Sequence, residues 1–210
     1  MSILDELTTQ RRSIRTYKPD MPPEEWIAVM LRCAAKAPSP TNSRPVRFIR
    51  IKSSDRRATL RGAMHQGYQS LLDAAKKCEK PRRRTNIINA YWRYSEFIND
   101  APLLFAVGVK TDGNGFSKRL LEAELIPRDD RTDSDLDISI GLALKGFLLK
   151  GTELGLGMCI LTAPLVFAGD IDKILGLSGI RIKCLVTAGY PDETPPYLER
   201  MQASDMLLEI

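Results

Sequence analysis

Residues 11–15 read Arg11-Arg12-Ser13-Ile14-Arg15, which places three guanidinium groups and a hydroxyl within five positions near the start of the chain. Guanidinium is planar, permanently charged and matched to phosphate or carboxylate oxygens through paired hydrogen bonds. Three such groups close together repel one another, so an anion between them would stabilise the cluster. The alternative interpretation is a solvated run of surface charge.

A second unusual stretch follows about one helix later, Ala37-Pro38-Ser39-Pro40-Thr41-Asn42-Ser43-Arg44-Pro45. Together the two stretches predict a phosphate-bearing cofactor that is held without a glycine-rich loop. Neither the dinucleotide-binding motif G-x-G-x-x-G nor the P-loop motif G-x-x-x-x-G-K occurs in the sequence. Gly155-Leu156-Gly157 follows a predicted helix rather than a strand and has Ile160 where a dinucleotide fold needs its third glycine. A helix end that turns into a strand explains this stretch sufficiently.

Length and composition predict one domain over residues 1–210. The chain is 43% hydrophobic and 27% charged, which supports a full core and ordinary solubility. No stretch approaches the ~18 uninterrupted apolar residues of a membrane span. Asp5 and Glu6 interrupt the basic-then-apolar order of a signal peptide. We therefore expect a cytoplasmic protein with no membrane contact.

The cysteines and the histidine indicate neither a metal site nor an acid–base dyad. Four cysteines are scattered without a close pair, and His65 is the one histidine. This excludes a Cys/His zinc site of usual spacing and makes disulfides and a Ser-His-Asp hydrolase poor interpretations. The net charge is +5, and residues 76–84 are the densest basic run. Without a nucleic-acid-binding motif, a solvated helix end explains that run better than a nucleic-acid partner does.

Apolar periodicity predicts an α+β layered fold around a central sheet. Strands are expected at 46–52, 103–109, 157–161 and 180–188. Helices are expected near 2–9, from Pro22 to Pro38, from Ser54, from Ile87 to Ile98, at 136–154 and at 170–175. Residues 111–135 form a polar excursion, with a short helix at 117–124, and excursions of this length are often lids. The helix at 136–154 is apolar nearly all round, which favours a subunit interface.

Four segments, in order, resemble the nitroreductase-type FMN-dependent flavoproteins. Arg11 to Tyr17 resembles their R-R/H-S-x-R-x-F/Y start, and Ala37 to Pro45 resembles their A-P-S-x-x-N-x-Q-P-W segment. Glu153 to Gly157 resembles the end of their long central helix. Gly189-Tyr190-Pro191, with Arg200 nine residues further on, resembles their closing G-Y-P and basic tail.

The resemblance implies a three-layer α/β/α sandwich with a central mixed sheet. It also implies a homodimer with FMN at each of two interface sites, and a C-terminal extension at 189–210 that crosses to the partner. Arg11, Arg12, Ser13 and Arg15 would hold the phosphate and ribityl chain, with Arg200 as a second charge at the phosphate. The other subunit would supply residues that pack along the flavin: Pro38, Ser39, Pro40, Thr41, Asn42 and Arg44. Leu161, Thr162 and Ala163 match the strand end whose backbone approaches the flavin ring.

The implied activity is ping-pong hydride transfer from NADH or NADPH, through FMN, to a nitroaromatic, a quinone or a related electron-poor small molecule. FMN supplies the chemistry, so no catalytic side chain is expected. Arg44 and Val46 depart from the glutamine and tryptophan usual in the family. The alternatives are a reductive dehalogenase or flavin-fragmenting enzyme of the same fold, a non-catalytic FMN-binding sensor and, more remotely, a nucleic-acid-binding protein.

Overall fold

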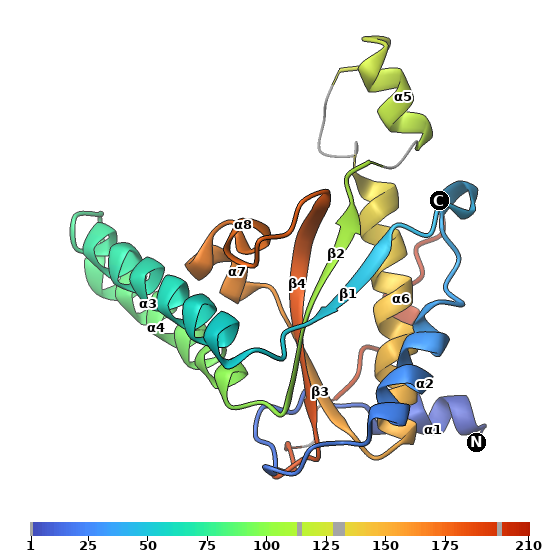
Figure 1. Ribbon diagram of the computed structural model, residues 1–210, viewed down its shortest axis with the longest axis horizontal. Helices are drawn as coiled ribbons and strands as arrows, with labels where there is room; N and C mark the ends of the chain where they lie inside the picture. The colour runs from blue at the N-terminus through green and yellow to red at the C-terminus, as the bar shows by residue number, and fades with distance from the viewer. Residues whose placement is uncertain (1, 113–114, 128–132, 197–198) are drawn as a thin grey trace.

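The structure is a computed structural model that describes residues 2–112, 115–127, 133–196 and 199–210. Its helices are α1 (Ile3–Gln10), α2 (Glu24–Ala34), α3 (Ser54–Lys76), α4 (Pro81–Arg93), α5 (Phe116–Glu122), α6 (Ser134–Glu153), α7 (Ala163–Ala168) and α8 (Ile171–Ile174). Its strands are β1 (Val46–Arg50), β2 (Leu103–Lys110), β3 (Gly157–Leu161) and β4 (Ile180–Gly189). All four predicted strands are confirmed, and so is the short helix of the 111–135 excursion (Figure 1).

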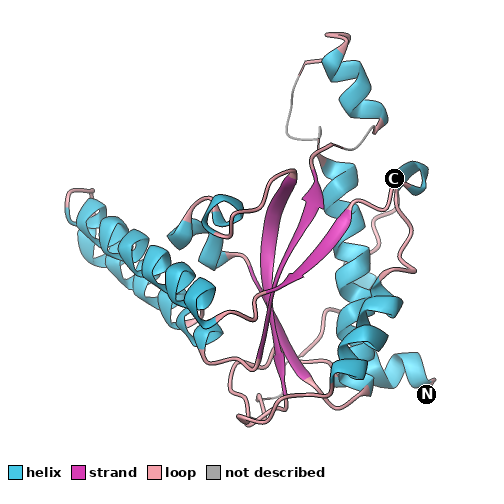
Figure 2. Cartoon of the chain, viewed as in Figure 1, coloured by secondary structure: helices cyan, strands magenta, loops and turns pink. Residues whose placement is uncertain are grey.

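The sheet lies between two layers of helices, which confirms the three-layer α/β/α sandwich (Figure 2). Strand β2 is buried on both faces, as its continuous apolar run predicted. Leu103, Phe105 and Val107 pack in a cluster with α2 and α6, whereas Leu104 and Ala106 pack with α3, α7 and α8. Successive side chains of a strand point to opposite faces, so one apolar strand supplies both halves of the core.

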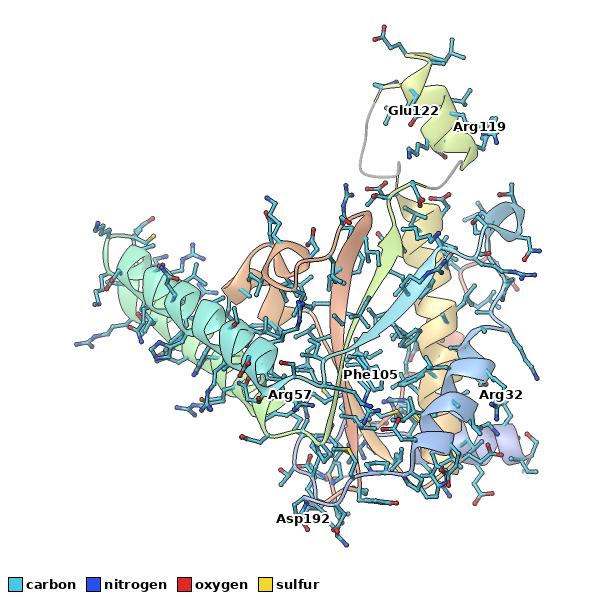
Figure 3. All side chains as sticks on the ribbon, viewed as in Figure 1. Arg32, Arg57, Phe105, Arg119, Glu122 and Asp192 are labelled. Atoms are coloured by element: carbon cyan, nitrogen blue, oxygen red, sulfur yellow. The ribbon has the colours of Figure 1, made fainter. Side chains whose placement is uncertain are left out.

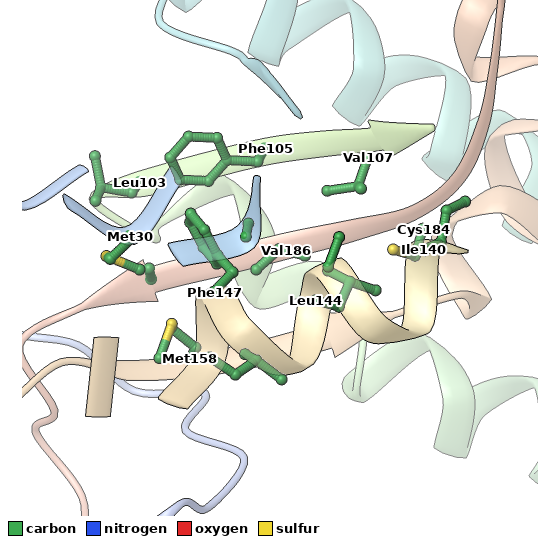
Figure 4. Close-up of a cluster of buried hydrophobic side chains, with 14 of the residues drawn as sticks. Met30, Leu103, Phe105, Val107, Ile140, Leu144, Phe147, Met158, Cys184 and Val186 are labelled. Atoms are coloured by element: carbon green, nitrogen blue, oxygen red, sulfur yellow. The ribbon is translucent and has the colours of Figure 1, made fainter. Parts of the chain in front are cut away.

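Figure 4 shows the half of the core beneath α6. Phe147 of α6 is fully buried, stacks on Phe48 with ring centroids 4.8 Å apart, and meets Phe105 edge-on at 5.5 Å. Met30 of α2 is buried in the same cluster. These contacts fix α2 and α6 on one face of the sheet. α2 leads into the loop of residues 38–44 and α6 leads into β3, and both of these segments carry predicted cofactor-binding residues.

The prediction of a mixed sheet is wrong. The strand order is β1-β2-β4-β3, and every pairing of these strands is antiparallel. Two helices occupy the connection from β1 to β2, and two occupy the connection from β3 to β4. α3 and α4 lie side by side as an outward and a returning helix, so the chain comes back to the end of the sheet where β1 finished, and β2 runs in the opposite direction (Figure 1).

Two helices differ from expectation. α4 ends at Arg93 rather than near Ile98, and a separate 3₁₀ turn, Glu96–Asn99, follows it. α7 was not predicted, although Pro164 in its first turn is a recognised helix-start signal. Tyr68, Trp92 and Phe167 join α3, α4 and α7, with Tyr68 and Trp92 stacked at 4.4 Å.

The apolar helix α6 is buried on one side only. Ile140, Leu144 and Phe147 face the core, whereas Ile138 is 60% exposed and Leu142 is 43% exposed. Of the predicted excursion and tail, residues 113–114, 128–132 and 197–198 lie outside the described residues. No helix in the described ranges is long and apolar enough to cross a membrane.

Candidate functional site

Residues 11–15, called the arginine segment below, are anchored to the free edge of β3. Helix α1 begins with a capping box in which Ser2 and Asp5 bond reciprocally, and it ends where the Arg11 N–H donates to the Leu7 carbonyl at 3.0 Å. Ser13 then forms an isolated parallel bridge with Met158, and the Ile14 N–H donates to the Met158 carbonyl at 3.1 Å. The segment therefore lies beside β3 like a short extra strand.

Gly157 makes this close approach possible. A Cβ built on Gly157 would lie 2.6 Å from Cγ1 of Ile14, which is shorter than any ordinary carbon contact. Ile14 is itself buried, at 6% exposure. A buried isoleucine thus fixes the segment, and the arginines on either side are left available at the surface.

Three of the four predicted phosphate-binding arginines lie together. Nη2 of Arg200 donates to the Arg11 carbonyl at 2.9 Å, and Nη2 of Arg12 donates to the Pro196 carbonyl at 2.6 Å. Burial first, and then the charges of Arg200 and Arg12, lower the pKa of the Arg11 guanidinium. A lowered arginine pKa means that the charged form is held at an energetic cost, which a bound anion would relieve.

Arg15 leaves this group in another direction. Its guanidinium carbon stands 5.1 Å from the centre of the Tyr94 ring, in a cation–π contact at the end of α4. Cys159 of β3 is close enough to Arg11 and Arg15 for both charges to affect it, although burial dominates and raises the pKa of its thiol. Two arginine charges thus act on β3 at Cys159, two residues before the strand ends.

The end of β3 leads directly into α7. Leu161 is buried, Thr162 is exposed, and Ala163 begins the helix. The order of residues along β3 therefore places the predicted ring-contacting segment just beyond Cys159.

The loop of residues 38–44 lies apart from the arginine group of the same chain. It follows the C-terminal end of α2, whereas the arginine segment precedes the N-terminal end of that helix (Figure 1). Pro38, Ser39, Arg44 and Ser139 of α6 are among the residues that line a cavity of about 300 Å³. The structure of one chain does not unite the two predicted halves of the site.

This loop has an unusual backbone. Thr41, Asn42 and Arg44 have φ angles of 51°, 55° and 48°, in the left-handed region that favours glycine. Ser39 Oγ accepts a bond from the Arg44 N–H at 2.9 Å, and Arg44 Nε donates to Asn42 Oδ1 at 3.1 Å. Backbone strain of this kind concentrates at functional sites.

Two residues that contact Arg15 were not predicted from the sequence, Tyr94 and Glu193. One carboxylate oxygen of Glu193 accepts the backbone N–H groups of both Arg15 and Thr16. Neither residue has a sequence signal of its own, because each is brought to the cluster by tertiary folding. Among the described residues, no group of three or more His, Cys, Asp or Glu side chains is placed to hold a metal ion.

The model of the nitroreductase family matches residues 8–190. An iodotyrosine deiodinase of Thermotoga neapolitana is 26% identical over 205 residues, which is 95% of each chain.

Two solved structures are similar in fold. A BluB-like flavoprotein from Clostridium difficile has a TM-score of 0.79 and 24% identity, and the match covers 100% of this chain and 99% of that one. The FMN-dependent nitroreductase NfnB from Mycobacterium smegmatis, solved with NADPH, has a TM-score of 0.68 and 18% identity, with 99% and 98% coverage.

Proposed function

The chain belongs to the nitroreductase family, and on that premise we propose that it is an FMN-dependent NAD(P)H oxidoreductase. Its substrates would be nitroaromatics, quinones or related electron-poor small molecules. The observation that supports this most is that Arg11, Arg12 and Arg200 lie together, with Nη2 of Arg200 donating to the Arg11 carbonyl at 2.9 Å. Burial first, and then the charges of Arg200 and Arg12, lower the pKa of Arg11.

The residues present fit the phosphate end of FMN. Guanidinium groups bind phosphate bidentately, and the Ser13 hydroxyl lies in the same segment. Arg11, Arg12, Arg15 and Arg200 would hold the phosphate, and Ser13 would extend the contact toward the ribityl chain. Leu161 to Ala163 would offer backbone groups to the ring.

The chemistry that FMN supplies when bound is two-electron transfer between NAD(P)H and an acceptor. The chain's own contribution is orientation and charge. The arginine group fixes the phosphate end, β3 and the start of α7 define where the ring lies, and the exposed Tyr94 ring offers an aromatic surface beside Arg15. One ring face serving donor and acceptor in turn predicts ping-pong kinetics, with parallel double-reciprocal plots.

A homodimer is part of this proposal. The exposed Ile138 and Leu142 give α6 an uncovered apolar surface. The loop at 38–44 cannot meet the arginine group of its own chain, but a second copy could bring it there. Residues 190–196 and Arg200 contact residues 11–18 of their own chain. A crossing to the partner is therefore proposed for residues 201–210, where Leu207, Leu208 and Ile210 are exposed. A stable flavin-loaded monomer in light scattering would contradict this arrangement.

A reductive dehalogenase of the same fold is the second candidate, and the full-length likeness to a deiodinase favours it. The test begins with the absorption spectrum of the purified protein, which should show bound flavin. Anaerobic addition of NADH or NADPH should bleach that flavin, whereas a non-catalytic sensor would stay yellow. The reduced protein is then mixed with a nitroaromatic, a quinone or a halogenated phenol. Halide release would favour the dehalogenase, and loss of the flavin itself would indicate a flavin-fragmenting enzyme.

A further inference from the structure

The segment that follows β4 doubles back along residues 15–18. The Lys18 N–H donates to the Tyr190 carbonyl at 2.9 Å, and the Asp192 N–H donates to the Thr16 carbonyl at 2.9 Å. A bridge between Tyr17 and Pro191 completes the pairing. Figure 3 labels Asp192, which lies at the end of the molecule opposite α5.

Glu193 adds a side-chain contact to this backbone pairing. Its Oε1 accepts the N–H of Arg15 and, at 3.1 Å, the N–H of Thr16. Two successive peptide N–H groups that converge on one charged oxygen form a strong pair of donors to an anion. This single carboxylate therefore ties down the peptide units on both sides of the Arg15 α-carbon, and so restrains the direction in which the Arg15 side chain leaves the backbone.

The charge of Glu193 acts in the opposite sense. The charges of Glu193, Arg11 and Arg15 all affect the pKa of Cys159, so the Glu193 carboxylate and both guanidinium groups lie near that thiol. A negative charge there opposes the binding of a second anion to the arginines. The hydrogen bonds of Glu193 organise the arginine segment, whereas its charge disfavours the anion that the segment would bind.

We propose that Glu193 is a positioning residue for the arginine segment, and that it acts through its hydrogen-bond acceptor oxygen rather than through its charge. The inference rests on the proposed function, because it takes the phosphate of FMN as the anion in question. It does not require Glu193 to touch FMN.

Two substitutions separate the two roles. Glu193→Gln keeps an oxygen that can accept both N–H bonds and removes the charge, whereas Glu193→Ala removes both. Asp192→Ala is the matched control, because it deletes the neighbouring exposed carboxylate while the backbone pairing of residue 192 stays in place. The Kd values of FMN and of riboflavin are measured by flavin fluorescence for all four proteins. Hydrogen exchange of the Arg15 and Thr16 amides is measured without flavin.

In Glu193→Ala we expect FMN to bind about tenfold more weakly, the scale of one lost charge-assisted contact. The Kd of riboflavin should change little, and the two amides should lose protection. Glu193→Gln and Asp192→Ala should bind FMN as tightly as the wild type or more tightly, with the amides still protected.

Three results would overturn the inference. They are an unchanged FMN Kd in Glu193→Ala, equal weakening of FMN and riboflavin, or a Glu193→Gln variant as weak as Glu193→Ala. A wild-type protein that binds no flavin would instead refute the proposed function. In that case hydrogen exchange in the flavin-free protein would still show whether Glu193 holds the segment.

Discussion

Replacing Arg11 with glutamine should weaken FMN binding without weakening the fold. Arg11 is half-buried beside Arg200 and Arg12, and burial first, then these two charges, lower its pKa. A charge-assisted hydrogen bond contributes ~1.5–3 kcal/mol. Because Arg11 is less screened by solvent than an exposed arginine, we expect a loss of about 2 kcal/mol, or ~30-fold in Kd.

The same substitution should not lower the stability of the flavin-free protein. Arg11→Gln removes the repulsion among the three guanidinium groups, so the thermal midpoint of unfolding should stay the same or rise. The assay is a fluorescence titration with FMN and with riboflavin, combined with a melting curve of the flavin-free protein. Arg61→Gln, on the exposed surface of α3, is the control for loss of one positive charge. An unchanged FMN Kd, or an equal loss for riboflavin, would show that Arg11 does not bind the phosphate.

Three other changes test neighbouring features. Arg44→Gln should lower the two-electron reduction potential of bound FMN by about 30 mV or more, ~1.4 kcal/mol, because a positive charge near the ring favours the reduced form; an unchanged potential in an anaerobic redox titration would place Arg44 away from the ring. Gly157→Ala should destabilise the protein by about 1–3 kcal/mol in urea unfolding and weaken FMN binding, because the new Cβ would lie 2.6 Å from Ile14. Burial raises the pKa of Cys184 to about 12 from 9.0, so the folded state holds this proton more tightly than the unfolded state does. The resulting stabilisation is present below pH 9 and is lost as the pH rises toward 12, at up to ~1.4 kcal/mol per pH unit; Cys184→Ala should flatten this fall between pH 9 and 10, and equal slopes would contradict it.

The local pattern predicted the elements well, and their pairing less well. The run from Leu103 to Val109 is apolar at every position, and such a run indicates a strand buried on both faces. The direction of its neighbours was not encoded there. It depends on how the connecting helices pack on the sheet, which is tertiary information, and the short α7 between β3 and β4 was overlooked despite Pro164.

The site shows the same division between local and distant information. Arg11 to Arg15 stand out in the sequence because three guanidinium groups and a hydroxyl fall within five positions. The contacts of Arg11 with Arg200 and of Arg15 with Glu193 span 189 and 178 positions. Only the tertiary fold brings such residues together, so Glu193 could not be distinguished in the sequence from any other exposed acid. The union of the 38–44 loop with the arginine segment remains a prediction, since it requires a second subunit.

The position of β4 in the sheet has a consequence for synthesis of the chain. β4 is the last strand to leave the ribosome, yet it pairs with both β2 and β3. Until residues 180–189 are available, a nascent chain can form only the β1–β2 pair, and β3 has no partner strand. Exposed strand edges of this kind favour aggregation. Residues 190–200 emerge later still, and they carry Glu193 and Arg200. The arginine segment is therefore made well before the residues that complete it, so flavin loading should follow the emergence of residues 190–200.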